Sequence, residues 1–221
     1  MGAMDAEVSR LREELRDRRE ETVGGTTVWR GWLHARPVAL AQSGVGKVNA
    51  ALATAALASL GVEAIIFTGL AGGLAPGIAV GDVVVASDLV QHDVDVTALG
   101  FAPGVLLGEP LSWPTDPRWR ERAIRAVAST GAKVHVGRIA SGDQFIASAD
   151  RVAQLRSSFG ALAAEMEGAA TAMAATKLGI PFVVVRIISD SADDEAHLDF
   201  PAFLAQAAER SLHWVSVMLT E

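Results

Sequence analysis

Three acidic residues occupy positions at which a carboxylate could contact a bound ligand. Glu165 and Glu167 lie two residues apart within the apolar stretch Ala161–Thr171, and Asp190 closely follows the apolar run Pro181–Ile188. Charged groups avoid apolar surroundings unless they bind something. In open α/β sheets, ligands bind beyond the carboxyl ends of the strands, and a carboxyl group there can keep its proton near neutral pH. These three residues are therefore candidates for proton transfer or for binding a polar ligand.

Each candidate also has a plain structural interpretation. Acidic residues favour the start of a helix, so Glu165 and Glu167 could simply begin one, and the residues alone leave the two interpretations balanced. Asp190 precedes further acidic residues, and such a group is usually a solvated loop. The run of β-branched and apolar residues before Asp190 fixes its position at a strand end, which favours a functional interpretation for it.

Two glycine-rich segments each follow a predicted strand. Glycines in Ser43–Gly46 and Thr68–Gly73 would let the backbone approach a ligand and would leave N–H groups free for an anion or a hydroxyl. Neither segment matches the G-x-G-x-x-G or Walker pattern, so the sequence does not indicate a dinucleotide or a nucleoside triphosphate. Taken alone, each segment favours a plain turn over a binding loop.

The elements that position these residues alternate between strands and helices. We expect helices at 5–20, 47–60, 117–129, 150–157, 167–178 and 202–220, strands at 28–33, 37–42, 64–68, 81–86, 134–139 and 181–188, and a long loop at 100–117. Such alternation predicts an α/β fold with three layers, in which a mixed, largely parallel central sheet is flanked by helices. A chain of 221 residues fits a single domain, 1–221.

Composition excludes several classes of function. The net charge of −7 argues against a nucleic-acid partner, because nucleic-acid binders usually carry a basic face. The absence of cysteine excludes disulfides and thiolate metal sites, and His197 has no second histidine at ligand spacing, so we expect no metal. No secretory leader is visible and no apolar run is long enough to span a bilayer, so we expect no membrane contact and a cytoplasmic location.

Eight motifs, in order along nearly the whole chain, carry a specific resemblance. They are Gly2-Ala-Met-x-x-Glu7, Ser43-Gly-Val-Gly-Lys47, Thr68-Gly-x-Ala-Gly-Gly-Leu74, Gly81-Asp-Val-Val84, His92-Asp-x-Asp-Val-Thr97, Ser141-Gly-Asp-x-Phe145, Glu165-Met-Glu167 and Arg186-x-Ile-Ser-Asp190. Together they resemble the bacterial 5′-methylthioadenosine/S-adenosylhomocysteine nucleosidases, which have the nucleoside phosphorylase-like fold. The resemblance implies hydrolysis of the N-glycosidic bond of a 5′-thio-adenosine to adenine and a thioribose, with no cofactor. 5′-Deoxyadenosine is a further expected substrate.

The resemblance also implies roles for individual residues. Asp190 would donate a proton to N7 of adenine, Glu7 would activate the attacking water, and Glu167 would hold the 2′- and 3′-hydroxyls, as in an inverting glycoside hydrolysis. Phe145 would stack on adenine and Ile146 would give backbone contacts. Met166 and Arg186 match family positions near the ribose, Leu70 lies near the water or anion site, and the 5′ tail would be lined by Met4, Val45, Val96 and Phe200. The other expected substrate-binding residues are Glu165, Ser189 and Ala192. The family is commonly a homodimer, and residues 102–114 would reach the neighbouring site.

The chain departs from the family pattern at three places. The family begins with a strand before Gly-Ala-Met, and only Met1 stands there, so we expect the first strand to be missing through a late start codon or a shortened chain. Leu70 replaces a small hydroxyl residue near the water, and Leu99 replaces an aromatic residue near the tail. The last two changes bear on the substrate rather than on the reaction class.

Other functions stay open at this point. A purine nucleoside phosphorylase would need cationic groups around phosphate, which Glu7 would repel. A nucleosidase for aminodeoxyfutalosine would take a bulkier 5′ tail. A catalytically dead nucleoside-binding protein would have no need for both an acid and a base. Methionine salvage, signal-precursor production and quinone synthesis all stay open as pathways.

Overall fold

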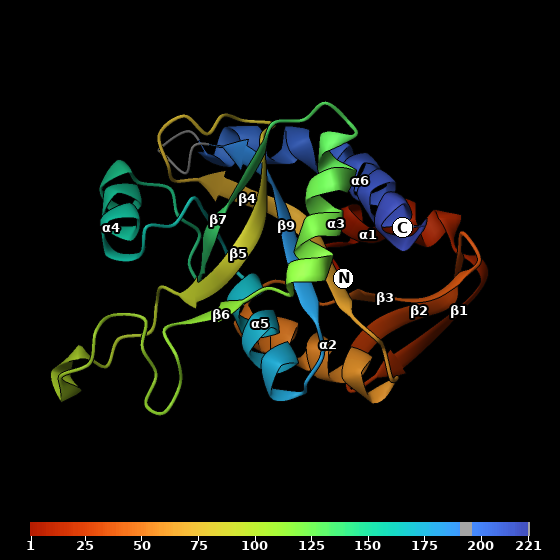
Figure 1. Cartoon of the computed structure of the whole chain (residues 1–221), viewed down its shortest axis with the longest axis horizontal. Coiled ribbons are helices and arrows are strands. Elements are labelled where there is room, and N and C mark those ends of the chain that lie inside the picture. The colour runs from red at the N-terminus through yellow and green to blue at the C-terminus, as the bar shows by residue number, and fades with distance from the viewer. Residues whose placement is uncertain (191–195, 221) are drawn as a thin grey trace.

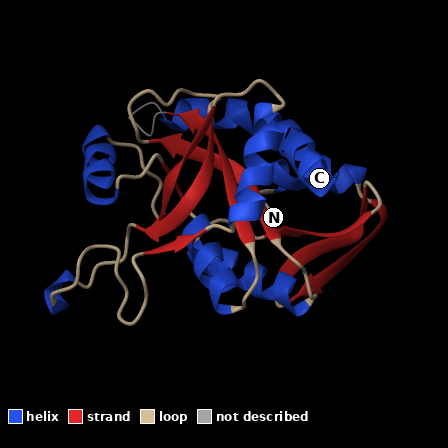
Figure 2. Ribbon diagram, viewed as in Figure 1, coloured by secondary structure: helices blue, strands red, loops and turns tan. Residues whose placement is uncertain are grey.

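Two sheets form the framework of the structure (Figures 1 and 2). The structure is a computed structural model that describes residues 1–190 and 196–220, except for the side chains of 196–202 and 205–206. The three-stranded sheet contains β1 (Arg16–Val23), β2 (Thr26–Leu33) and β3 (Arg36–Gln42), all antiparallel. The six-stranded sheet contains β4 (Ile65–Gly73), β5 (Val83–Gln91), β6 (Ser112–Pro114), β7 (Val134–Ser141), β8 (Ala163–Glu165) and β9 (Phe182–Asp190).

The six-stranded sheet curls until five of its strands, all except β6, close into a ring. Its order is β6-β5-β7-β8-β4-β9, and β5 also pairs with β9. Pairing is parallel for β4–β9, β5–β7 and β7–β8, and antiparallel for β4–β8, β5–β6 and β5–β9. The predicted mixed, largely parallel sheet is therefore confirmed, and its closure through β5 and β9 is an additional feature that the sequence pattern does not predict.

Helices cover both faces of the sheets (Figure 2). They are α1 (Asp5–Glu14), α2 (Lys47–Ser59), α3 (Pro117–Ala128), α4 (Ala149–Phe159), α5 (Gly168–Lys177), α6 (Ala196–Thr220) and the short 3₁₀ helix η1 (Thr97–Leu99). One apolar core contains residues of α1, α3 and α6, and another contains residues of α2 and α5, which gives the three predicted layers. Among the helices described, none is long and apolar enough to cross a membrane.

Local sequence signals define the ends of several helices. Asp116 caps α3 by accepting hydrogen bonds from the N–H groups of Arg118 and Trp119, both at 3.0 Å, and Pro117 occupies the first helical position. Ser148 caps α4 in the same way, and Gly160 ends it in the left-handed conformation. These signals explain why the predicted and observed bounds agree closely for α3 and α4.

Strand β9 is the element that carries the central site residues. All nine of its residues are buried, and the strand pairs with β4 on one side and β5 on the other. A strand covered on both faces reads as a continuous apolar run rather than an alternating one. The sequence therefore marks β9 clearly, and the two polar residues that follow its apolar part, Ser189 and Asp190, lie at its carboxyl end.

Two local predictions were wrong, and one short strand was not predicted. The helix expected at 5–20 ends at Glu14, because the charged segment that follows it forms β1, an exposed edge strand without apolar alternation. The glycine-rich segment 68–73 is not a turn, because β4 runs through it and pairs residue by residue with β9. The start of the acidic cluster belongs to β8, which has only three residues and so gives no periodic signal.

Residues at the N-terminal end of the sequence connect the two sheets. The Met1 amino group donates to the Ile66 carbonyl at 2.8 Å, and the Thr68 N–H donates to the Met1 carbonyl at 3.1 Å. On the other side, the Gly2 N–H donates to the Ala41 carbonyl of β3 at 3.2 Å. These residues thus lie between β3 and β4. The absence of a strand before Gly2 stays a prediction.

Candidate active site

A cavity of about 260 Å³ lies at the carboxyl ends of β4, β8 and β9. Its lining is Ala3, Met4, Glu7, Val45, Leu70, Ala71, Gly72, Gln144, Phe145, Ile146, Ala164, Glu165, Met166, Glu167, Ser189 and Asp190. Most of this lining is apolar, and a few carboxylates converge on it. Such a combination is typical of small-molecule sites.

The structure brings most of the predicted site residues to this cavity. Those in its lining are Met4, Glu7, Val45, Leu70, Phe145, Ile146, Glu165, Met166, Glu167, Ser189 and Asp190. Arg186 lies buried beside the glutamates, outside the lining. Val96 lies at the start of η1, also outside the lining. Ala192 and the side chain of Phe200 lie outside the described residues.

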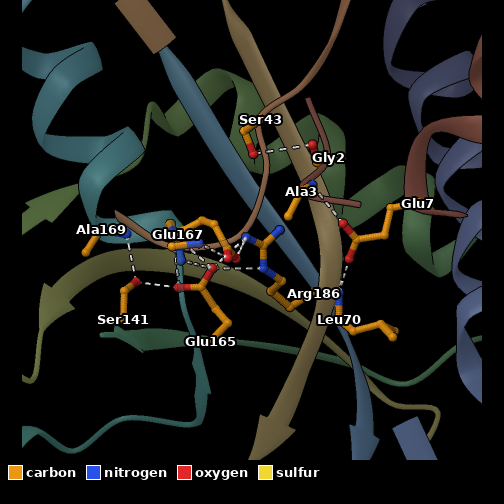
Figure 3. Close-up of polar contacts among 12 residues, drawn as sticks. Gly2, Ala3, Glu7, Ser43, Leu70, Ser141, Glu165, Glu167, Ala169 and Arg186 are labelled. Carbon is orange, nitrogen blue, oxygen red and sulfur yellow. Dashed lines mark hydrogen bonds and ion pairs between the residues drawn. The ribbon is translucent and has the colours of Figure 1, made fainter. Parts of the chain in front are cut away.

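Arg186 and Glu165 form a fully buried ion pair (Figure 3). The Arg186 Nη2 and Nε atoms donate to Glu165 Oε2 at 2.5 and 3.2 Å. Glu165 also accepts hydrogen bonds from the Ser141 hydroxyl and from the N–H groups of Glu167 and Gly168. Protein donors thus saturate the Glu165 carboxylate. In this arrangement, Glu165 holds Arg186 and the turn between β8 and α5 in place.

Arg186 is held as a cation in a buried position. Burial would lower its pKa, but the carboxylates of Glu165, Glu167 and Glu7 outweigh burial and raise the pKa. The guanidinium also stacks over the Phe67 ring, with 4.1 Å from its central carbon to the ring centroid. Its Nη1 atom has no hydrogen-bond partner among the described residues, which leaves one buried donor available to a ligand.

Glu7 is buried in the first turn of α1 and is oriented by three backbone donors. Its Oε2 accepts from the N–H groups of Ala3 at 2.8 Å and Met4 at 3.1 Å, and its Oε1 accepts from Leu70 at 3.2 Å (Figure 3). Gly69 makes this approach possible: a Cβ there would lie 2.7 Å from Glu7 Oε1 and 3.1 Å from Arg186 Nη1. The carboxylate and the guanidinium therefore both approach the backbone of a residue without a side chain.

Glu167 is less completely paired than Glu165. Its Oε1 accepts from the Gly46 N–H at 2.8 Å, and its Oε2 lies 3.9 Å from Arg186 Nη2. Burial and the Glu165 charge raise the pKa of Glu167 to about 7, although Arg186 and the Gly46 N–H act in the opposite direction. Glu167 is therefore close to the midpoint of its titration at neutral pH. Its side chain lines the cavity.

Asp190 ends β9 at the cavity wall, opposite Gly72 of β4. It is buried, and the Ser189 hydroxyl donates to its Oδ2 at 2.6 Å. The cavity is more open near Phe145, whose side chain is 53% exposed, and near Val45, which is 47% exposed. The site thus combines buried acids with a partly open apolar edge. Such a site can give and take protons on a ligand that has both a polar and an apolar part.

Sequence reasoning missed several supporting residues. The Ser141 hydroxyl is a partner of Glu165, and Gln144 lines the cavity beside Phe145. Ser141 is the last residue of β7 and Gln144 follows it closely, and polar residues at the end of a strand were a usable signal. The Gly46 N–H contact with Glu167 joins residues 121 positions apart, and nothing local in the sequence indicates it.

Comparisons with known proteins agree with this geometry. The Phosphorylase superfamily matches residues 1–219. A 5′-methylthioadenosine/S-adenosylhomocysteine nucleosidase of Actinobacillus succinogenes is 41% identical over 223 residues, which cover all of this chain and 97% of the relative.

Solved structures of relatives superpose along nearly the whole chain. A 5′-methylthioadenosine/S-adenosylhomocysteine nucleosidase from Neisseria meningitidis, in complex with methylthio-immucillin-A, has a TM-score of 0.94 at 41% identity and covers 99% of this chain and 96% of its own. A futalosine hydrolase of Helicobacter pylori has a TM-score of 0.94 at 36% identity and covers 99% of this chain and 95% of its own. The resemblance carried by the eight motifs is thereby confirmed: the chain belongs to the phosphorylase superfamily and, within it, to the family of the 5′-methylthioadenosine/S-adenosylhomocysteine nucleosidases, which are hydrolases.

Proposed function

We propose that this protein hydrolyses the N-glycosidic bond of 5′-methylthioadenosine and S-adenosylhomocysteine, releasing adenine and a 5-thioribose. The observation that carries the proposal is that two buried acids, Glu7 and Asp190, line one cavity together with Glu167. General acid and base groups of a glycosidase need this shared access to one substrate. The nucleosidases among the relatives support the same reaction class.

In the proposed mechanism, Asp190 is the acid and Glu7 the base. Asp190 gives its proton to N7 of adenine as the bond between N9 and the sugar breaks, so the electron pair leaves with a neutral base. Positive charge then develops on the sugar, and the adjacent carboxylates stabilise it. Glu7 accepts a proton from the attacking water, whose oxygen forms the new bond to the anomeric carbon. Every proton and electron pair is thereby accounted for.

Glu167 and Arg186 serve the sugar in this proposal. Glu167 would accept hydrogen bonds from the 2′- and 3′-hydroxyls, and such charge-assisted contacts strengthen as the sugar becomes cationic. Arg186 would turn its unpaired Nη1 donor toward the water or a hydroxyl. Glu165 stays committed to its protein donors and keeps Arg186 in place.

The charge of the site favours water over phosphate as the nucleophile. Glu7 and Glu167 line the cavity with Glu165 beside them, and Arg186 is the cation that faces them from β9. A phosphate dianion would be repelled by these carboxylates. The buried, apolar side chain of Leu70 further reduces the polarity of the cavity beside Glu7. These contacts support a hydrolase rather than a phosphorylase.

A bulkier 5′ substituent gives a second candidate substrate. Val45 and Phe145 leave the apolar edge of the cavity about half exposed, so a longer tail has room to leave the pocket there. The futalosine hydrolase of Helicobacter pylori, at 36% identity, favours testing aminodeoxyfutalosine beside the thioadenosines. 5′-Deoxyadenosine, which has no tail atom beyond the methyl group, is the further substrate to test.

The proposal includes a homodimer in the cytoplasm. The segment between β5 and β6 extends away from the body of the chain (Figure 1), and it exposes Leu99, Phe101 and Leu107. Exposed apolar residues on a projecting segment are what a contact with a second copy would cover. Light scattering coupled to size-exclusion chromatography tests the dimer, and cell fractionation tests the location.

The decisive experiment is release of adenine, followed by chromatography with and without phosphate. We expect the wild type to release adenine from 5′-methylthioadenosine without phosphate, and Asp190→Asn to lose at least about a hundredfold in kcat. Release that requires phosphate would make the protein a phosphorylase. Tight binding of the nucleoside without any release would instead make it a catalytically dead binding protein.

A further inference from the structure

A closed ring of hydrogen bonds ties together three segments beside the cavity. Lys47 Nζ donates to Asp93 Oδ1 at 2.6 Å, the Asp143 N–H donates to Asp93 Oδ2 at 2.9 Å, and the Lys47 N–H donates to Asp143 Oδ1 at 2.7 Å. The ring joins the start of α2, the segment after β5 and the segment after β7. The mechanism above uses none of these three residues.

The ion pair in this ring is protected from solvent. The side chains of Lys47 and Asp93 are 18% and 14% exposed, so salt screens them less than a surface pair. Burial alone would raise the pKa of Asp93, but the hydrogen bonds from Lys47 and from the Asp143 N–H outweigh it and lower the pKa. Gln91 gives Lys47 Nζ a second acceptor at 3.1 Å. These contacts favour the charged form of the Asp93 carboxylate.

The ring fastens two walls of the cavity to each other. Val45 stands on one wall and residues 144–146 on the other. Gly46 lies between them in the left-handed region with φ of 97°, and a Cβ there would lie 2.9 Å from Asp143 Oδ1. From this position its N–H donates to Glu167 Oε1 at 2.8 Å. The ring thus holds the amide that contacts the sugar-binding carboxylate.

Several charged groups compete over the ionisation of Glu167. Glu165 on β8 and Glu7 on α1 disfavour a second negative charge, as does burial, whereas Arg186 on β9 favours it. The Gly46 N–H is the other contact that favours the carboxylate form. A donor that directly precedes Lys47 of the ring therefore contributes to the balance.

We propose that Lys47 and Asp93 are positioning residues for Glu167: their ion pair keeps the Gly46 N–H on the carboxylate and so keeps Glu167 in the form that accepts the sugar hydroxyls. This inference rests on the proposed function. It extends that function to a pair of side chains that do not line the cavity.

The test compares Lys47→Met and Asp93→Asn with Lys133→Met. Lys133 is an exposed lysine 3.7 Å from Asp82 and away from the cavity lining, so its loss controls for removal of a charge. Loss of the Gly46 contact should raise the pKa of Glu167 by about one unit, because a hydrogen bond to a charged group has that magnitude. Starting from a pKa of about 7, kcat/KM should then fall about tenfold at pH 6 but only about twofold at pH 8.

Two further variants sharpen the result. The double variant Lys47→Met/Asp93→Asn should be no worse than the poorer single variant, because both remove one interaction. Lys47→Arg keeps the cation and should restore most of the loss at pH 6. A loss of the same factor at both pH values, or none, would overturn the inference, since a merely structural defect has no reason to follow the titration of Glu167.

A measurement without turnover separates this inference from the proposed function. The Glu167 carboxyl carbon can be followed by ¹³C NMR and assigned by its disappearance in Glu167→Gln. A raised pKa in Lys47→Met supports the positioning role even when the wild type releases no adenine, which would count against the function alone. An unchanged pKa overturns the role. Should Lys47→Met not fold, Asp93→Asn gives the same reading.

Discussion

The buried carboxylate cluster and the open rim of the same cavity are built in opposite ways. The cluster, Glu7, Glu165, Glu167 and Arg186, is at most 7% exposed. The hydrogen-bond donors to its carboxylates include groups on β4, β7, β9 and the loop before α2. The rim, Val45 and Phe145, is about half exposed. The groups assigned to chemistry are thus fixed by the sheets within one chain. The groups assigned to the 5′ tail lie where a ligand or a second copy can still cover them.

The largest effect should come from removing the cation of the cluster. Arg186→Met would leave Glu165 as a buried charge without its partner, and breaking a buried pair in this way costs about 3–5 kcal/mol. We expect a fall of that size in the free energy of unfolding, measured with urea. Arg10→Met, which removes two exposed ion pairs, should leave the free energy of unfolding nearly unchanged. Similar losses for both variants would refute the contrast between a buried cluster and an ordinary surface.

The two glutamates of the cluster should respond oppositely to neutralisation. Because the pKa of Glu167 is raised from 4.5 to about 7, the folded chain holds a proton between these values that the unfolded chain has lost, and stability falls as pH rises through this window. Glu167→Gln should therefore stabilise the protein at pH 8 by up to about 3 kcal/mol and have little effect at pH 4. Activity should be largely lost.

Glu165→Gln is the matched control for this pH dependence. It removes the anion that pairs with Arg186, so it should destabilise the fold at pH 8. Thermal unfolding of both variants at pH 4 and pH 8 checks the prediction. The idea that Glu165 is structural and Glu167 is held for a ligand would be wrong if both changes moved stability in the same direction.

Glu7 lies so close to Gly69 that a side chain at this position should disturb catalysis. In Gly69→Ala the new methyl group would lie 2.7 Å from Glu7 Oε1, so the proposed base must move. We expect kcat to fall about 10- to 100-fold, because general-base catalysis depends on position. In Gly73→Ala, in the same strand, the nearest atom to the new methyl group is Ile188 Cγ2 at 3.3 Å, and the next two contacts are at 3.5 Å, so kcat should fall much less. Equal losses would point to strand β4 rather than to Glu7.

The sequence predicts the cluster better than the contacts that hold it. Asp190 is predictable because an unbroken apolar strand leads into it, and the acidic pair stands out because its neighbours are apolar. One N–H donor of Glu7 comes from the distant Leu70 and that of Glu167 from the distant Gly46, and only tertiary packing brings them there. Strand β1 is missed for the opposite reason: its exposed, charged residues carry no apolar period. Burial leaves a local signal, whereas pairing between distant residues does not.

The smallest effect should come from the rim. Phe145→Ala removes a side chain that is 53% exposed, so it should leave the free energy of unfolding nearly unchanged. It should still raise KM for 5′-methylthioadenosine about fivefold, because loss of aromatic stacking on a base costs about 1 kcal/mol at a half-open site. Phe145→Leu keeps the apolar area and should recover part of the loss through burial alone. A marked fall in stability with unchanged KM would mean that Phe145 belongs to the core, and the distinction between cluster and rim would then fail at its open edge.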